Sequence, residues 1–243
     1  MTTNKPLSIK PHTKALHALQ RLLPSRMMQK YTHRKVIEAF SAQLGLVYFG
    51  FVDQHADEHE LVRGFTLSVG HTDNHYSVGS AYGYDIILVE RTDVLKAPGA
   101  RTQRYNWIIL QIDLRSSGLP HAFFTSLSHP KVFYSHFFIK YARFQPLPAS
   151  VWRNHDPLFR ERFTTFSTPE SAEELVRLFS LDTTATIGRY FDRFEIELQD
   201  DKLFVYLSNQ PVTLASLEVL LKNGLWLAGQ IDSQVAASVT QQS

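Results

Sequence analysis

The sequence predicts an α+β fold: N-terminal amphipathic helices, then a mainly antiparallel β-sheet, then a C-terminal strand and helix module. Near the start, apolar residues recur at helical spacing, and Leu16, Leu19 and Leu23 mark one helix face. From Leu46 onward the apolar runs are short and closely spaced, with no crossover helices between them, which favours antiparallel pairing. The 17 Phe and 10 Tyr residues also favour strands, because flat rings pack well on a pleated surface.

These patterns divide the chain into four segments. Residues 1–44 form a basic helical segment, 45–148 an antiparallel β-rich subdomain, 149–233 a C-terminal α+β subdomain, and 234–243 a disordered tail. Gly45 ends the helical segment, since glycine is the usual residue just past a helix C-terminus. Pro146 and Pro148 mark the boundary between the two subdomains.

Each element follows from its own local signal. Alternating or continuous apolar runs between turn residues predict strands, and they lie at 46–53, 61–69, 76–80, 84–91, 105–114, 121–127, 132–144 and 159–166. Two further runs around Asp200 and Asp201 predict a hairpin of 194–198 and 203–207. Thr168 and Pro169 predict a helix start, and Thr213 caps a last helix.

The composition excludes several classes of protein. With no cysteine the chain has no disulfide, no thiolate nucleophile and no cysteine-bound metal, and no cofactor is expected beyond the metal considered below. Its first residues lack a signal-peptide apolar run, and its longest apolar runs are too short to cross a membrane. We therefore expect a cytoplasmic protein, either free or bound at the membrane periphery.

Positive charge is concentrated at the start of the chain. Residues 1–38 carry eight Lys or Arg against one acid, a net +7, whereas the rest of the chain carries 17 basic and 22 acidic residues, a net −5. This predicts contact with an anionic membrane surface or a nucleic acid. In the alternative, the apolar helix side packs on the sheet and the cations face water. The candidate partner-binding residues are Lys10, Lys14, Arg21, Arg26, Lys30, Arg34 and Lys35.

Two HxxxH segments are candidate metal sites, because neutral imidazoles near carboxylates are common metal ligands. They contain His55 with His59, and His71 with His75. A predicted strand separates the two segments, so they would form two separate sites and not one. Solvated turns between strands are the alternative interpretation.

Other patterns carry weaker signals. Asp85, Glu90 and Arg91 are similar to the acidic pair and basic residue of metal-dependent nucleases, but a separation of five places the two carboxylates on opposite strand faces. The aromatic and basic residues of 122–144 could stack on nucleic-acid bases, although core packing is the commoner use of such rings. No nucleophile elbow, phosphate-binding loop or dinucleotide fingerprint occurs.

The last third of the chain has a distinctive order of motifs: Phe159-x3-Phe163, Phe194-Glu195-Ile196, Asp201-Lys202-Leu203-Phe204-Val205-Tyr206 and a helix ending near Asp232. Together with Gly64-Phe65-Thr66 and Gly83-Tyr84-Asp85, it resembles uncharacterised bacterial proteins defined as a domain of unknown function, over roughly residues 45–232. The resemblance carries over no catalytic residue. It implies membrane helices before the module, where this chain has short basic amphipathic helices.

These observations favour a non-catalytic module that binds or scaffolds other macromolecules in the cytoplasm. The alternative is a metal-dependent hydrolase that uses one of the His-rich segments.

Overall fold

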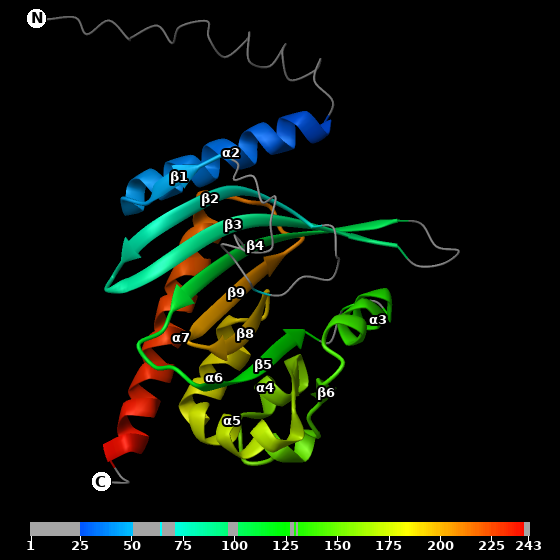
Figure 1. The fold of residues 1–243 in the computed structure, drawn as a ribbon, viewed down its shortest axis with the longest axis vertical. Coiled ribbons are helices and arrows are strands. Elements are labelled where there is room, and N and C mark those ends of the chain that lie inside the picture. Colours follow the sequence, from blue (N-terminus) through cyan, green and yellow to red (C-terminus); the bar gives the residue numbers. More distant parts are fainter. Residues whose placement is uncertain are drawn as a thin grey trace, which may run out of the picture.

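The computed structural model describes residues 25–50, 64, 71–96, 102–126, 129 and 131–240. Within them, nine strands form one sheet in the order β1-β2-β3-β4-β9-β8-β5-β7-β6 (Figure 1). The strands are β1 (Val47–Phe49), β2 (Thr72–Ala81), β3 (Tyr84–Leu95), β4 (Gln103–Asp113), β5 (Leu119–Ser126), β6 (Gln145–Pro146), β7 (Phe163–Ser167), β8 (Phe194–Asp200) and β9 (Lys202–Ser208).

Every pair of neighbouring strands in this sheet is antiparallel, which confirms the α+β prediction and the pairing expected within 46–114. Strands β2, β3 and β4 form a meander, and β4 then pairs with β9 of the C-terminal hairpin. The sheet is therefore continuous across residue 148. The strand expected at 61–69 lies outside the described residues except for Gly64.

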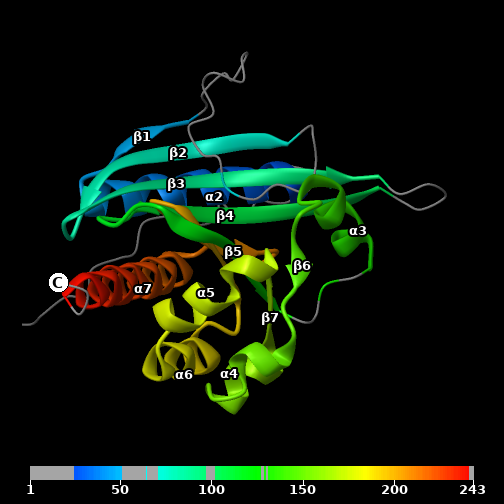
Figure 2. The ribbon, with the colours of Figure 1, turned by 60° about the horizontal axis from the view of Figure 1, so that its bottom comes forward.

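The helices are distributed unequally over the two faces of the sheet (Figure 2). One face, here called the helix face, packs against most of them, and the other packs against α3 alone among the described helices. The helix face carries α2 (Ser25–Leu44), α4 (Pro157–Arg162), α5 (Ala172–Leu178), α6 (Leu181–Tyr190) and α7 (Leu214–Thr240). The other, the α3 face, carries α3 (Lys131–Lys140) and a core of Phe, Tyr and Trp rings.

Helix α2 ends as the sequence predicts. Gly45 has a φ of +73°, and the amide of Leu46 donates to the carbonyl of Ser41 across 2.9 Å. This is the Schellman arrangement, which needs a left-handed residue just past the helix. The helix then packs on the sheet through Ile37 and Phe40, both buried. The apolar side expected around residues 16–23 lies outside the described residues.

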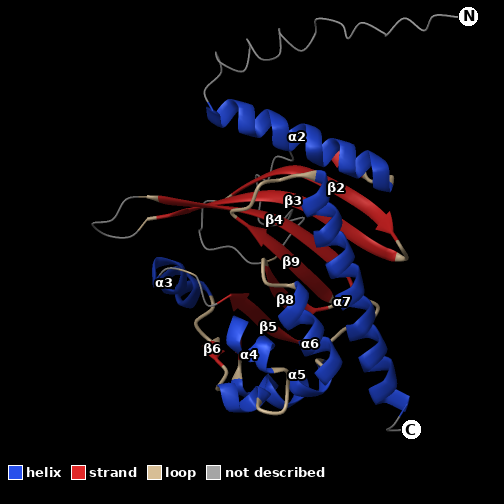
Figure 3. Cartoon of the chain, turned by 180° about the vertical axis from the view of Figure 1, so that it is seen from behind, coloured by secondary structure: helices blue, strands red, loops and turns tan. Residues whose placement is uncertain are grey.

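Helix α7 crosses the helix face diagonally and continues to Thr240 (Figure 3). The tail expected from residue 234 is therefore helical up to that point. Asp232 fixes this helix to the strands, since it accepts hydrogen bonds from the Tyr84 hydroxyl (3.0 Å) and from the amides of Arg115 and Ser116 (both 3.1 Å).

Two predicted strands were wrong, and one helix was not predicted. The strand predicted at 132–144 is mainly helix α3, because Phe133 and Phe137 recur at a helical spacing that the aromatic content concealed. The strand predicted at 159–166 begins as α4, capped by the side chain of Asp156, and only β7 is extended. Helix α6, which the side chain of Ser180 caps, was not predicted.

Candidate functional site: paired charges on both faces of the sheet

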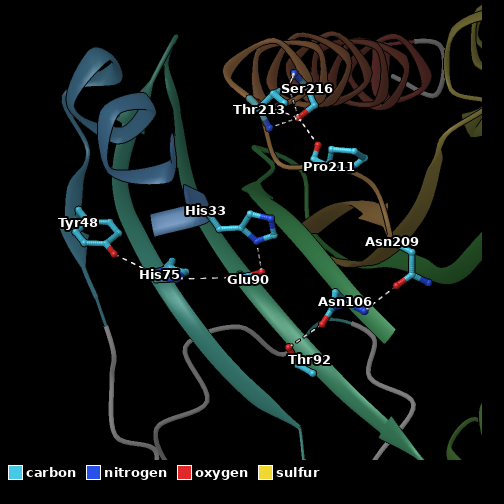
Figure 4. Close-up of polar contacts among 10 residues, drawn as sticks. All are labelled: His33, Tyr48, His75, Glu90, Thr92, Asn106, Asn209, Pro211, Thr213 and Ser216. Carbon is cyan, nitrogen blue, oxygen red and sulfur yellow. Dashed lines mark hydrogen bonds and ion pairs between the residues drawn. The ribbon is translucent and has the colours of Figure 1, made fainter. Parts of the chain in front are cut away.

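On the helix face, four polar side chains from four elements form one group, here called the Glu90 cluster (Figure 4). Glu90 of β3 lies 2.8 Å from Nδ1 of His33 on α2 and 3.5 Å from Nε2 of His75 on β2. The hydroxyl of Tyr48 on β1 lies 2.8 Å from Nδ1 of the same His75. The cluster thus joins α2 to the first three strands.

A β-bulge positions His75 in this cluster. Between Asn74 and Ser77 the register shifts, so that His75 and Tyr76 together oppose Val89. His75 has a φ of +58°, a left-handed conformation in which histidine is one of the enriched residue types. Beyond the bulge the alternation is reversed. Tyr76 therefore shares the α3 face with Asp73, while Ser77 bonds to Ser41 of α2 on the helix face.

The α3 face carries four buried carboxylates, here called the carboxylate row: Asp73, Asp93, Glu195 and Glu197. Asp73 holds Arg91, which is 1% exposed, through two hydrogen bonds of 2.8 and 2.6 Å from Nε and Nη2. Nη1 of Arg91 donates to the carbonyl of Gly64 across 2.9 Å. Burial disfavours the charged guanidinium, but the hydrogen bonds and charge of Asp73 outweigh it, and the pKa of Arg91 lies above its ordinary value.

The other three carboxylates also pair with side chains of neighbouring elements. Asp93 accepts from Nε1 of Trp107 across 2.9 Å. Glu197 accepts from the hydroxyl of Tyr206 and lies 2.7 Å from Nε2 of His121.

Glu195 contacts Nε2 of His129 through one oxygen. The other oxygen of Glu195 is buried and has no hydrogen-bond partner among the described residues. Burial raises the pKa of Tyr105 and Tyr134, and the negative charge of Glu195 raises both further.

Of the four candidate metal ligands, the structure describes His71 and His75 and separates them. His71 precedes β2 with its Nε2 3.8 Å from Asp73 on the α3 face, whereas His75 belongs to the Glu90 cluster on the helix face. Both lie at or in a strand and not in a solvated turn between strands, which was the alternative interpretation. In the described part of the chain, no three His, Asp or Glu side chains come together as ligands for a metal ion. His55 and His59 lie outside the described residues.

The nuclease-like group is divided as the strand alternation predicts. Asp85 is exposed and accepts a hydrogen bond from Ser80, while Glu90 lies under α2 on the helix face. Arg91 is buried on the α3 face. Alternation alone would leave Glu90 on a solvated face, but α2 covers this part of the sheet and the Glu90 side chain is mostly buried.

The rings of 122–144 are used in the core. Phe123, Phe133 and Phe137 are buried, and Phe133 lies 6.2 Å from the ring of Trp107. They are therefore not free to stack on bases. Phe138 is an exception, with an exposed fraction of 38%, and Ile139 beside it is 79% exposed.

Few of the candidate partner-binding residues can be placed. Arg34 and Lys35 are exposed on α2, and Nε of Arg34 lies 3.8 Å from Glu38 one turn on. Arg26 and Lys30 belong to the same helix. Lys10, Lys14 and Arg21 lie outside the described residues. No described helix is both long enough and apolar enough to cross a membrane.

Sequence reasoning singled out His75 and Glu90 but missed His33 and Tyr48, and it did not recognise the carboxylate row as a group. A usable signal exists in hindsight for the carboxylate row. Glu195 and Glu197 alternate with Phe194, Ile196 and Leu198, the residues that face the helices. Alternation alone assigns such acids to solvent, and the ring-rich helix α3 covers them instead.

No family model matches the chain, and no curated protein matches it either. One solved structure is similar: the crystal structure of the mycobacterial trehalose monomycolate transport factor A, TtfA. The two share 11% identity, with a TM-score of 0.53 over 84% of this chain and 94% of that one. At this low sequence identity, the comparison shows a similarity of fold alone.

Proposed function

We propose that this chain is a non-catalytic binding module of a transport assembly, which works in the cytoplasm and is held at an anionic membrane surface by its basic residues 1–38. The non-catalytic part of the proposal is supported by the partners of the buried charged side chains. Arg91 bonds to Asp73, Tyr206 and His121 bond to Glu197, and His129 contacts Glu195. The first three contacts connect neighbouring strands, and the fourth connects β8 to the segment before α3, which is the work of a scaffold.

The structural neighbour supports the transport part of the proposal. TtfA is a transport factor, and its likeness to this chain spans nearly its whole length, so the two folds correspond as units. A shared architecture does not fix a shared cargo. We therefore propose a role in a transport assembly and assign no cargo.

The charge distribution supports the membrane part. Residues 1–38 carry +7 in a chain whose net charge is +2. Cations near an anionic leaflet each contribute on the order of 1 kcal/mol, and the attraction weakens as salt is added. We favour a membrane over a nucleic acid because apolar residues accompany these cations at helical spacing, as in helices that lie in the membrane interface.

Binding of the full-length chain to vesicles tests the proposal. The variant Lys10→Gln/Lys14→Gln/Arg21→Gln should bind vesicles of phosphatidylcholine and phosphatidylglycerol on the order of a hundredfold more weakly than the parent at low salt. The matched variant Arg189→Gln/Arg193→Gln/Lys222→Gln removes three exposed cations elsewhere and should bind like the parent. Equal binding by all three proteins, or tighter binding to duplex DNA than to vesicles, would contradict the proposal.

A further inference from the structure

Helix α3 is apolar on two sides. Its inner side is fixed to the sheet, since the ring of Phe137 lies 4.9 Å from that of Phe166 and 5.4 Å from that of Phe123. On its outer side Ile139 is 79% exposed, the largest value for a large hydrophobic side chain in the described residues. Phe138 beside it is 38% exposed, and its ring meets those of Phe137 and Phe166 edge to face. The exposed pair is therefore held on a rigid base.

The stretch of sequence that contains α3 is positively charged. Residues 114–155 contain no Asp or Glu, and they contain five Lys or Arg: Arg115, Lys131, Lys140, Arg143 and Arg153. Lys140 and Arg143 are exposed directly after Ile139, and Arg104 is exposed at the start of β4. The four carboxylates of the α3 face, Asp73, Asp93, Glu195 and Glu197, are buried, and each contacts a side chain of the core. They are therefore not exposed on the outer side of α3.

We propose that the outer side of α3 (Phe138, Ile139, Lys140 and Arg143) is a second contact with an anionic membrane, in which Ile139 enters the interface and the cations meet lipid headgroups. The proposal rests on the membrane role given above and adds a site to it. Exposed apolar side chains beside cations are the pattern of interfacial membrane contacts. A nucleic acid fits less well, because the most exposed side chain, Ile139, has no ring on which a base could stack.

The position of α3 suits this contact. It lies at the margin of the molecule, on the side of the sheet opposite α4, α5 and α6, so a flat surface can approach it without meeting those helices (Figures 1 and 2). Residues such as Leu181 and Tyr190 are also exposed, but Asp182 and Asp192 adjoin them and would repel an anionic surface.

A single labelled position tests where the chain enters the membrane. Because the chain has no cysteine, Ile139→Cys introduces one thiol, which can carry a polarity-sensitive fluorophore. We expect its emission to shift to shorter wavelength with vesicles of phosphatidylcholine and phosphatidylglycerol, and to stay unchanged with phosphatidylcholine alone. Val239→Cys, at a similarly exposed position on α7 (64%), is the control and should show no shift. Vesicle binding without a shift at position 139, or with an equal shift at 239, would overturn the inference.

Affinity measurements separate this site from the N-terminal one. The full-length variant Ile139→Asp/Arg143→Gln should bind the anionic vesicles roughly tenfold or more weakly than the parent, since it loses an inserting side chain and a cation. Val239→Asp/Arg193→Gln is the matched control and should bind as the parent does. If only Lys10→Gln/Lys14→Gln/Arg21→Gln weakens binding, the α3 inference fails and the proposed function stands. If only the α3 variant does, the inference stands and the N-terminal role fails. Tight binding to an acidic protein, with none to vesicles, would contradict both.

Discussion

At the scale of single residues, the pair of Arg91 and Asp73 shows how strongly a buried charge depends on its partner. Both side chains are almost fully buried, with exposed fractions of 1% and 2%. The pair is held by two hydrogen bonds, and Tyr76 donates a further one to Asp73 across 3.1 Å. Neither charge can reach water if its partner is removed, so the single and the double replacement should behave differently.

We predict that Arg91→Met lowers the free energy of unfolding by about 3–5 kcal/mol, because it leaves Asp73 buried without a counter-charge. Asp73→Leu/Arg91→Met should recover most of that loss. Arg193→Met replaces an exposed arginine and should change stability by less than about 0.5 kcal/mol. Urea unfolding of the four proteins measures these differences. A double variant as unstable as Arg91→Met would contradict the argument.

A second residue-scale prediction concerns His71. Burial lowers its pKa below the ordinary value, and the positive charge of Arg91 lowers it further, while Asp73 opposes both. The folded protein therefore keeps His71 neutral at a pH where the unfolded chain binds a proton. The contribution of His71 to the free energy of unfolding is therefore fully present above about pH 6.5, and it is lost as the pH falls toward the lower pKa of the folded state.

The variant His71→Gln should therefore lose less stability than the parent between about pH 7.5 and about pH 5.5. Unfolding free energies from urea titrations at both pH values provide the measurement. Each protein serves as its own reference, because the prediction concerns the change in its unfolding free energy between the two pH values. An identical pH dependence in both proteins would show that His71 titrates alike in the folded and unfolded states.

At this scale, sequence reasoning placed His71 and His75 together in one candidate site, whereas a bulge and the two faces of the sheet separate them. A one-residue insertion that reverses the alternation leaves no periodic signal, because the residues before and after it each keep a period of two. The burial of Glu90 depends on α2, which is distant in sequence.

At the scale of elements, α4 and α6 contact each other through backbone. A β-carbon at Gly188 of α6 would lie 2.7 Å from the backbone nitrogen of Phe159 and 3.1 Å from its α-carbon. Nη1 of Arg162 also donates to the carbonyl of Gly188 across 2.9 Å. The two helices can approach this closely because position 188 has no side chain.

We predict that Gly188→Ala destabilises the protein by about 2 kcal/mol, because the cost of separating two backbones exceeds the gain in helix propensity of about 1 kcal/mol. Gly229→Ala is the matched control on α7. Its β-carbon would meet nothing closer than the Tyr84 hydroxyl at 4.0 Å, so it should stabilise by about 0.5–1 kcal/mol. Thermal and urea unfolding give both values. If Gly188→Ala stabilised the protein instead, α4 would have to move away from α6 without a cost in free energy.

Elements with an unambiguous local signal were predictable, and elements composed mainly of aromatic residues were not. The C-terminal hairpin of β8 and β9 and the capped start of α7 follow directly from their turn and cap residues. In α3, rings occupy both the buried and the exposed side, so no polar face marks the helical period. Its fold is set by the rings of β4, β5 and β7 that it covers.

At the scale of the whole molecule, charge and architecture divide the chain in different ways. The basic residues gather in 1–38 and 114–155, with net charges of +7 and +5, while the other residues sum to −10. The sheet does not follow these divisions, because β4 and β5 before residue 148 pair with β9 and β8 after it. The division of charge along the sequence therefore does not correspond to a division of the sheet.

This continuity leads to the last prediction: 45–148 and 149–233 unfold together. The three tryptophans, Trp107 in β4, Trp152 in the 3-10 helix η2 (Ala149–Trp152) and Trp226 in α7, lie on both sides of the expected boundary. Protein labelled with 5-fluorotryptophan gives one fluorine resonance for each, and separate replacements of Trp152 and Trp226 by Phe assign all three. In a urea titration all three should lose their native signals at the same midpoint, because separating the halves would break the β4–β9 and β5–β8 ladders and expose the core on both faces. Far-ultraviolet circular dichroism should give that midpoint as well. A midpoint for Trp107 distinct from that of Trp152 and Trp226 would instead establish residues 45–148 and 149–233 as separate cooperative units.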